Sequence, residues 1–256
     1  MVITSKDNEI VKHIRKLREK KEREEAGEFI VEGIKMLEEA VREKARIKMI
    51  VVSEELNQNP IPQDVLYKVA KEKLIYVSES VFKTLTDVNS PQGILAIIEK
   101  NQTKEIDFSQ DLFLILDNIQ DPGNMGTILR TADSVNLKQV IVPKGNADCY
   151  NPKVVRSTMG AIFRVSVIEV EDLSKSIKEM KKHKIQILVT ALETKDSIYD
   201  VDYKRSAIVI GNEGNGVSKE VLELADKKIK IPMPGKTESL NAAVATGIIL
   251  YHAIRK

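Results

Sequence analysis

The sequence predicts an α/β protein, with a C-terminal domain built on a parallel sheet and a smaller α/β domain before it. In the C-terminal half, short runs of consecutively apolar residues alternate with helix-like stretches, as in strands covered on both faces. A polar stretch without periodicity precedes them and predicts a linker at residues 101–110. We therefore expect one domain at residues 1–100 and another at residues 111–256. The expected strands of the second domain are 112–116, 139–142, 185–190, 207–210 and 228–231.

The first 100 residues also alternate between helical and extended patterns. A loop containing Pro60 and Pro62 separates their two halves. The expected helices are 8–25, 34–43, 64–71 and 81–85, and the expected strands are 28–31, 47–52, 74–77 and 94–98.

Basic residues gather near the N-terminus, although the net charge of the chain is only +2. They are Lys6, Lys12, Arg15, Lys16, Arg18, Lys20, Lys21 and Arg23. Such a segment is suited to follow the phosphates of a nucleic acid. A solvated amphipathic helix, with Ile10, Ile14 and Leu17 as its buried stripe, explains the same pattern. The charge run alone leaves both interpretations open.

The composition argues against disulfide-bonded, metal-binding, membrane and secreted classes of protein. Cys149 is the single cysteine, so an intramolecular disulfide and a cysteine-based zinc site are not expected. The three histidines, His13, His183 and His252, have no ligand-like spacing, and we expect no metal. No apolar run approaches the ~20 residues of a membrane span, and the N-terminus lacks the apolar segment of a signal peptide. We expect a cytoplasmic protein without a membrane partner.

The first candidate functional loop follows the strand expected at 112–116. Pro122 and Gly123 predict a turn, and Asn124 is a candidate cap of the helix behind it. Arg130 falls about two turns into that helix. Because ligands of α/β domains bind beyond the carboxyl ends of strands, Arg130 is a candidate ligand-binding residue. A structural ion pair with an acid is the alternative.

The second loop, residues 211–216, follows the strand expected at 207–210. Its three glycines, Gly211, Gly214 and Gly216, allow close approach of the backbone to a ligand. The spacing is G-x-x-G-x-G rather than the G-x-G-x-x-G of dinucleotide-binding proteins. A nicotinamide enzyme is therefore disfavoured.

The third loop follows the strand expected at 228–231. Residues 235–237 imitate the end of a phosphate-binding P-loop, but Lys230 stands where that motif requires glycine. Pro232 and Pro234 instead predict a stiff loop that delivers Ser239 and Asn241 to the start of the final helix. Taken alone, Ser239 is better explained as a helix cap.

Together and in this order, the three loops resemble the motifs of the SpoU (TrmH) family of the SPOUT superfamily. The first motif corresponds to residues 118–130, the second to 210–217 and the third to 231–243. The likeness continues through residues 151–153 and 160–161. The N-terminal part is similar to the substrate-binding extension of this family, a module related to ribosomal proteins, through residues 29–33 and 92–93.

The resemblance implies a C-terminal domain with a deep trefoil knot, an exception to the rule that chains avoid threading. The knot would hold S-adenosylmethionine through backbone around Gly211, Ile231 and Leu240, with Thr190 and Met233 nearby. It also implies a homodimer. The final helix, residues 242–254, is apolar on most sides, which suits a partner subunit, although burial within one subunit explains this pattern too.

The implied reaction is transfer of a methyl group to a ribose 2′-hydroxyl of RNA, with Arg130 as the principal residue. A guanidinium stays protonated, so we expect Arg130 to stabilise the developing alkoxide rather than to act as a base. Asn124 and Glu213 would orient Arg130 and the loops; for Glu213, an ion pair with a nearby lysine is the alternative. Ser239 and Asn241 would bind the target nucleotide or fix the third loop.

The expected substrate is structured RNA, most of all 23S ribosomal RNA, because the N-terminal module is extended. The alternatives are a transfer-RNA ribose methyltransferase, a methyltransferase that confers antibiotic resistance by modifying the ribosome, and a non-catalytic RNA-binding or ribosome assembly factor with the same fold. Aromatic residues make up only 4% of the chain, which disfavours a large base-stacking platform.

Overall fold

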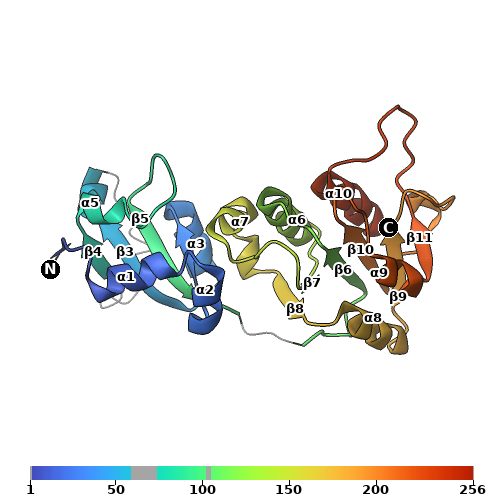
Figure 1. Ribbon diagram of the computed structural model, residues 1–256, viewed down its shortest axis with the longest axis horizontal. Helices are drawn as coiled ribbons and strands as arrows, with labels where there is room; N and C mark the ends of the chain where they lie inside the picture. The colour runs from blue at the N-terminus through green and yellow to red at the C-terminus, as the bar shows by residue number, and fades with distance from the viewer. Residues whose placement is uncertain (1, 59–73, 102–104, 256) are drawn as a thin grey trace. The chain divides into compact units, whose positions relative to one another are not determined.

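A computed structural model describes residues 2–58, 74–101 and 105–255 (Figure 1). The chain forms two compact units. Unit 1 comprises Met1–Asn101 and Tyr150–Phe163, and unit 2 comprises Gln102–Cys149 and Arg164–Lys256. The helix expected at residues 64–71 and the loop with Pro60 and Pro62 lie outside the described residues. The domain boundary at residues 101–110 stays a prediction.

Unit 1 is built on a mixed five-stranded sheet in the order β1-β4-β3-β5-β2. Strand β5 pairs antiparallel with β2 and β3, whereas β4 pairs parallel with β1 and β3. The strands are β1 (Val2–Ile3), β2 (Glu28–Glu32), β3 (Ile47–Ser53), β4 (Leu74–Val77) and β5 (Ile94–Glu99). The helices are α1 (Glu9–Lys16), α2 (Lys20–Ala26), α3 (Ile34–Arg42), α5 (Glu79–Phe82) and α7 (Pro152–Thr158), with 3₁₀ turns η1 (Glu54–Gln58) and η3 (Ala161–Phe163).

The single helix expected at residues 8–25 is wrong, because the structure breaks it into α1 and α2. Arg23 explains the break. Its side chain is buried, and Nη1 donates hydrogen bonds to the carbonyl oxygens of Leu17 and Arg18, at 2.7 and 2.6 Å, just after α1 ends. These carbonyls therefore bond a guanidinium instead of continuing the helix. Arg23 therefore has a structural role and is not one of the exposed cations.

A buried carboxylate, Glu28, anchors the start of β2. His13 Nε2 lies 2.7 Å from one carboxylate oxygen, and Lys48 Nζ donates to the other. Burial raises the pKa of Glu28, but the hydrogen bonds from Lys48 and His13 outweigh it, and the pKa lies below its ordinary value. The charged form of Glu28 thus stabilises unit 1.

Unit 2 is built on a parallel six-stranded sheet in the order β11-β9-β10-β6-β7-β8, which confirms the predicted α/β architecture. Its strands are β6 (Leu112–Asp117), β7 (Gln139–Pro143), β8 (Ser166–Val170), β9 (Gln186–Thr190), β10 (Ser206–Gly211) and β11 (Lys227–Ile229). Its helices are α6 (Pro122–Ser134), α8 (Leu173–Lys182), α9 (Lys219–Leu224) and α10 (Ala242–Ala253), with the 3₁₀ turn η4 (Ile198–Asp200).

Two details of this sheet differ from expectation. Strand β8 was not among the predicted strands, because Ser166 and Glu169 interrupt its apolar run at an edge of the sheet. Strand β11 ends at Ile229 rather than at residue 231, so the third loop begins two residues earlier.

The core of unit 2 lies beside its central strands, where Phe113 and Ile115 of β6 and Val209 of β10 have no exposed surface. Ile106 and Phe108, from the stretch expected to be a linker, pack against this core. No helix among residues 2–58, 74–101 and 105–255 is long and apolar enough to cross a membrane. The trefoil knot stays a prediction.

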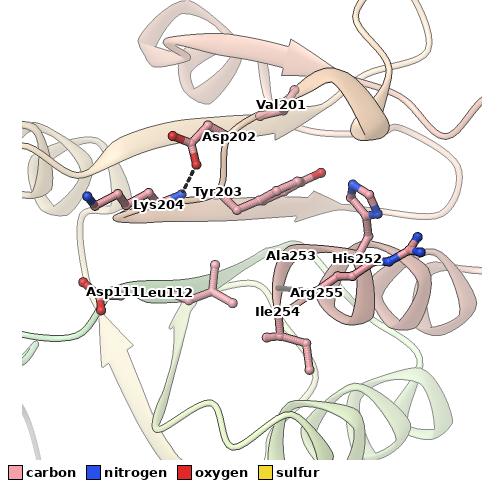
Figure 2. A pocket seen from close by; sticks show the side chains of 10 residues that line it. All are labelled: Asp111, Leu112, Val201, Asp202, Tyr203, Lys204, His252, Ala253, Ile254 and Arg255. Carbon is pink, nitrogen blue, oxygen red and sulfur yellow. Dashed lines mark hydrogen bonds between the residues drawn. The ribbon is translucent and has the colours of Figure 1, made fainter.

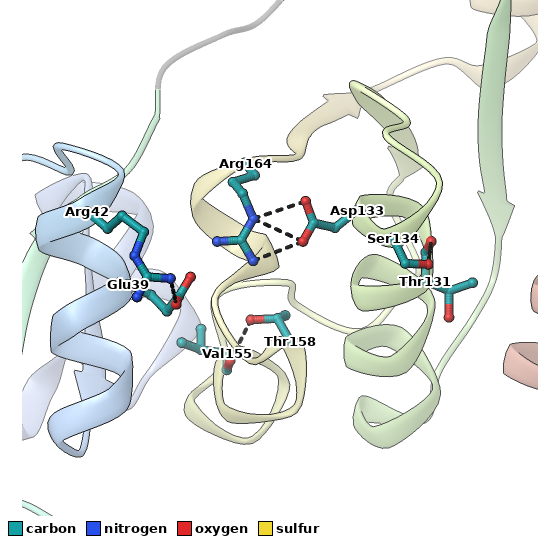
Figure 3. A network of polar contacts seen from close by, with 8 residues as sticks. All are labelled: Glu39, Arg42, Thr131, Asp133, Ser134, Val155, Thr158 and Arg164. Atoms are coloured by element: carbon teal, nitrogen blue, oxygen red, sulfur yellow. Dashed lines mark hydrogen bonds and ion pairs between the residues drawn. The ribbon is translucent and has the colours of Figure 1, made fainter.

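Polar contacts fix helix α6 within unit 2 (Figure 3). Near its C-terminal end, Asp133 forms a two-pronged ion pair with Arg164, whose Nε lies 3.0 and 2.9 Å from the two carboxylate oxygens. On another face, Tyr251 of α10 donates a hydrogen bond to Ser134 Oγ at 3.2 Å. Helix α6 is therefore held in place at the end remote from the first loop.

We predict that Glu28→Gln lowers the free energy of unfolding by about 1–3 kcal/mol at pH 7, because a neutral amide replaces a buried, hydrogen-bonded carboxylate. A carboxylate with a lowered pKa stabilises the fold above its unfolded pKa, and this contribution disappears as the pH falls through the folded value. The difference between wild type and variant should therefore shrink below the ordinary value of 4.5. Urea denaturation between pH 3 and 7 measures it. Glu25→Gln, at an exposed position, is the control, and a pH-independent difference would contradict the prediction.

Candidate active site

The three predicted loops leave the same edge of the unit 2 sheet. Carboxyl ends of parallel strands share one edge, and β6, β10 and β11 are all parallel members of this sheet. Strands β6 and β10 are direct neighbours, and β9 alone separates β10 from β11. The topology thus brings together segments that are about 90 to 120 residues apart in the chain.

Asn124 joins all three loops through its side-chain amide. Its Nδ2 donates to Glu213 Oε1 at 2.5 Å, and its Oδ1 accepts from Asn241 Nδ2 at 2.9 Å. Three of the five predicted catalytic residues are therefore in direct contact. An amide is suited to this position because it offers a donor and an acceptor at once.

Helix caps prepare this arrangement, but they are not the expected ones. Asp121, rather than Asn124, caps α6, because its Oδ1 accepts from the backbone N–H of Asn124 at 2.7 Å. Asn241 caps α10, accepting from Ala243 N at 3.0 Å. The cap role considered for Ser239 is therefore wrong; Ser239 is exposed in the preceding loop. With its Asn124 bond, Asn241 links the start of α10 to the start of α6.

Arg130 lies on an exposed face of α6, two turns after Asn124. The structural ion pair considered for it is not formed with any residue in the described part of the chain. A guanidinium in water, held on a helix fixed at both ends, presents its donors to an incoming ligand.

The predicted cofactor residues Gly211 and Thr190 end neighbouring strands, β10 and β9. A Cβ on Gly211 would lie 2.4 Å from backbone atoms of Gly216 and Val217, so only glycine fits there. Thr190 is half-buried and donates its hydroxyl to the carbonyl oxygen of Val209 at 3.0 Å.

Ile231, Met233 and Leu240, the other predicted cofactor residues, lie on the loop between β11 and α10. Their side chains are half-buried beside residues that are exposed. Within the described residues, the backbone of loop 231–240 has no hydrogen-bond partner. Free backbone groups next to partly covered apolar side chains suit an adenosyl group, which needs an apolar slot and a few fixed polar contacts. The residues present therefore fit S-adenosylmethionine.

Asn146, in the loop after β7, is a functional candidate that no sequence pattern indicated. Its Oδ1 accepts from Ile119 N at 2.6 Å, and its Nδ2 donates to the carbonyl oxygens of Leu116 and Pro143 at 2.9 and 2.8 Å. It thus fixes the first loop where it leaves β6. Its position just beyond the carboxyl end of a predicted strand was the available signal, but no motif marks it.

A cavity of about 510 Å³ lies elsewhere in unit 2, where β6 begins and α10 ends (Figure 2). It is lined by side chains of both charges, including Asp202, Lys204 and Arg255. Because it lies at the amino ends of strands, it is at the opposite edge of the sheet from the three loops. None of the predicted site residues lines it.

A parallel α/β unit with three interlocked strand-end loops and an exposed arginine fits the resemblance to the SpoU family. Similarity to known proteins leads to the same class of methyltransferase. Residues 111–251 match the SpoU rRNA Methylase family, and residues 8–96 match the MRM3-like substrate binding domain. The chain belongs to the SpoU rRNA methylase family.

Full-length relatives extend this match over both units. The chain is 35% identical to the 23S rRNA (guanosine(2553)-2′-O)-methyltransferase RlmP of Bacillus subtilis, with 98% of each chain covered. It superposes on the AdoMet-bound rRNA methyltransferase of Sinorhizobium meliloti with a TM-score of 0.83 and 30% identity, covering 99% and 97% of the two chains. For the SpoU methyltransferase AviRb of Streptomyces viridochromogenes with AdoMet, the TM-score is 0.85 at 26% identity, covering 96% and 97%.

The chain is accordingly an RNA ribose 2′-O-methyltransferase with S-adenosylmethionine as its cofactor. The predicted class of enzyme, its α/β fold and its cofactor are thereby confirmed. The roles of the individual site residues stay predictions, and the contacts described above support them.

We predict that Gly211→Ala weakens S-adenosylmethionine binding at least tenfold, because the added Cβ forces the second loop to open. Isothermal titration calorimetry measures the dissociation constant. Gly214→Ala is the matched control in the same loop, since its Cβ would meet only Asn212 Oδ1, at 3.6 Å. Equal affinities for the two variants would contradict the prediction.

Proposed function

We propose that this protein methylates a ribose 2′-hydroxyl of 23S ribosomal RNA. The observation that carries the proposal is the contact of Asn124 with both Glu213 and Asn241, on the helix that presents Arg130. The choice of RNA rests on the similarity to RlmP over 98% of both chains and on the match of unit 1 residues to a substrate-binding domain.

S-adenosylmethionine supplies, when bound, a methyl group on a sulfonium that leaves as a neutral thioether. Backbone of the loops at Gly211, Ile231 and Leu240 would hold it, with Thr190 and Met233 beside it. The chemistry that it would supply is transfer of this methyl group to the ribose oxygen, with loss of the hydroxyl proton to water.

Arg130 stabilises the negative charge that grows on the ribose oxygen and binds a neighbouring phosphate. A planar guanidinium serves both purposes, since its five donors allow paired hydrogen bonds to oxygen atoms. Asn124 and Glu213 hold the loops around it, while Asn241 fixes the third loop. Ser239, exposed on that loop, is free to contact the target nucleotide.

Unit 1 would bind the RNA through exposed cations on α1. Lys12, Lys20 and Lys21 each pair with a glutamate on the same helix, and Arg23 is buried. Arg15 and Lys16 are exposed and form no ion pair within the described residues, so we propose them as phosphate contacts. Binding through phosphates should weaken steeply with salt.

Mapping of ribose methylation tests the proposal directly. Purified protein is mixed with unmodified 23S ribosomal RNA, unmodified transfer RNA and labelled cofactor, and the products are located by mass spectrometry. A single methylated 23S ribose supports the proposal. A methylated transfer RNA would favour the transfer-RNA enzyme, and a methylated drug-site nucleotide would favour a resistance role. Cofactor binding without transfer to either RNA would contradict the proposal.

We predict that Arg130→Lys lowers kcat at least 100-fold at saturating RNA, while the melting temperature changes little because Arg130 is exposed. Lysine keeps the positive charge but lacks the planar guanidinium group, whose paired donors can bind two oxygen atoms at once. Steady-state kinetics measure kcat. Lys138→Arg, at an exposed position after the same helix, is the control. Near-normal turnover of Arg130→Lys would show that the planar guanidinium group is not required for catalysis.

We also propose a homodimer, formed through the exposed side of α10 in unit 2. Val244 and Tyr251, seven residues apart on one face of this helix, are 52% and 55% exposed. Apolar side chains aligned on a helix face favour a partner surface.

We also propose that the protein is located in the cytoplasm. Its single cysteine is consistent with the reducing conditions there.

We predict that Val244→Glu converts the dimer into a monomer of 28.8 kDa, because a charge would be buried at the interface. Analytical ultracentrifugation measures the mass. Val2→Glu introduces the same charge at a position of unit 1 that is 41% exposed, and should leave the dimer intact. A Val244→Glu protein that remains dimeric would exclude α10 as the interface.

A further inference from the structure

Asn212 uses its side chain to build the turn that carries Glu213. Its Oδ1 accepts hydrogen bonds from the backbone N–H groups of Gly214 and Asn215, each at 2.9 Å. The backbone of Asn212 also pairs with that of Gly216 in both directions, at 3.0 Å. Glu213 is thus flanked by residues whose backbone positions are fixed.

The same side chain ties this turn to the first loop. Asn212 Nδ2 donates to the carbonyl oxygen of Asn118 at 2.9 Å. Asn118 has a left-handed backbone, with φ of 63°, which turns the chain immediately after β6. A second tie lies at the far end of the turn, where Asp117 Oδ2 accepts from Ser218 N at 2.8 Å. The turn is therefore held against the first loop at both of its ends.

These contacts matter more for position than for stability. Asn212 is partly exposed and the residues of the turn after it are exposed, so water can replace the lost hydrogen bonds at a small net cost. The hydrogen bond from Asn124 Nδ2 to Glu213 Oε1, however, joins two different loops and is 2.5 Å long, so it depends on where each loop lies. A displacement of about 1 Å is enough to cost on the order of 100-fold in rate.

We propose that Asn212 is a positioning residue for methyl transfer, setting where Glu213 lies relative to Asn124. The inference rests on the proposed function of this site and adds a residue that none of the predicted roles includes. Asn212 contacts neither reactant; it acts through Glu213. Its two functions are separable, since one oxygen builds the turn and one nitrogen ties it to Asn118.

Five variants test the inference. Asn212→Ala removes both functions, and Asn212→Asp keeps the accepting oxygen but loses the donor to Asn118. We expect each to lower kcat at least tenfold with little change in melting temperature. Asn215→Ala, which keeps its backbone N–H, should lose much less. In a Glu213→Gln background, adding Asn212→Ala should cost less than threefold more, because residues that act through one another are not additive.

Two kinetic results would overturn the inference: an unchanged kcat in Asn212→Ala or Asn212→Asp, or losses that multiply fully in the double variant. If the wild-type protein methylates no ribosomal RNA, the proposed RNA target is wrong, but the inference about Asn212 is not affected. Asn212 is then tested by amide exchange at Gly214 and Asn215, which should be at least tenfold faster in Asn212→Ala. Unchanged exchange there would overturn the inference.

Discussion

The hydrogen bonds of Asn124 to Glu213 and Asn241 are the interactions on which the site depends. Each partner comes from a different loop, and no two of the three residues are neighbours in sequence. The chain could therefore not hold this arrangement locally; it needs the parallel sheet to bring three strand ends to one edge. The buried central strands supply a rigid base for it.

Side-chain amides then refine what the sheet provides. Asn146 fixes the first loop to the ends of β6 and β7, and Asn212 ties the second loop to Asn118. Asparagine suits these turns, because a short side chain with a donor and an acceptor replaces backbone hydrogen bonds that the loops lack. Arg130 is left without such a bond among the described residues, which keeps its guanidinium available for substrate.

The sequence predicted the parallel sheet because residues 112–116 and 207–210, in its central strands, are apolar at every position. It predicted the loops because their motifs are read along the chain. It did not reveal Asn146 or Asn212, whose roles arise from contacts between loops. Strand β8 was not predicted, because its polar residues interrupt the strand pattern. Helices α1 and α2 were predicted as one helix, because Arg23, whose buried guanidinium ends α1, cannot be distinguished in the sequence from an exposed charge. Helix periodicity does not reveal that a side chain a few residues further on bonds the last carbonyl groups of a helix.

Hydrogen–deuterium exchange with and without S-adenosylmethionine tests most directly whether the three loops form one cofactor site. If they do, residues 118–124, 210–217 and 230–241 should gain protection together, at the same cofactor concentration. Protection confined to one loop, or centred on the cavity at residues 201–204 and 252–255, would contradict it.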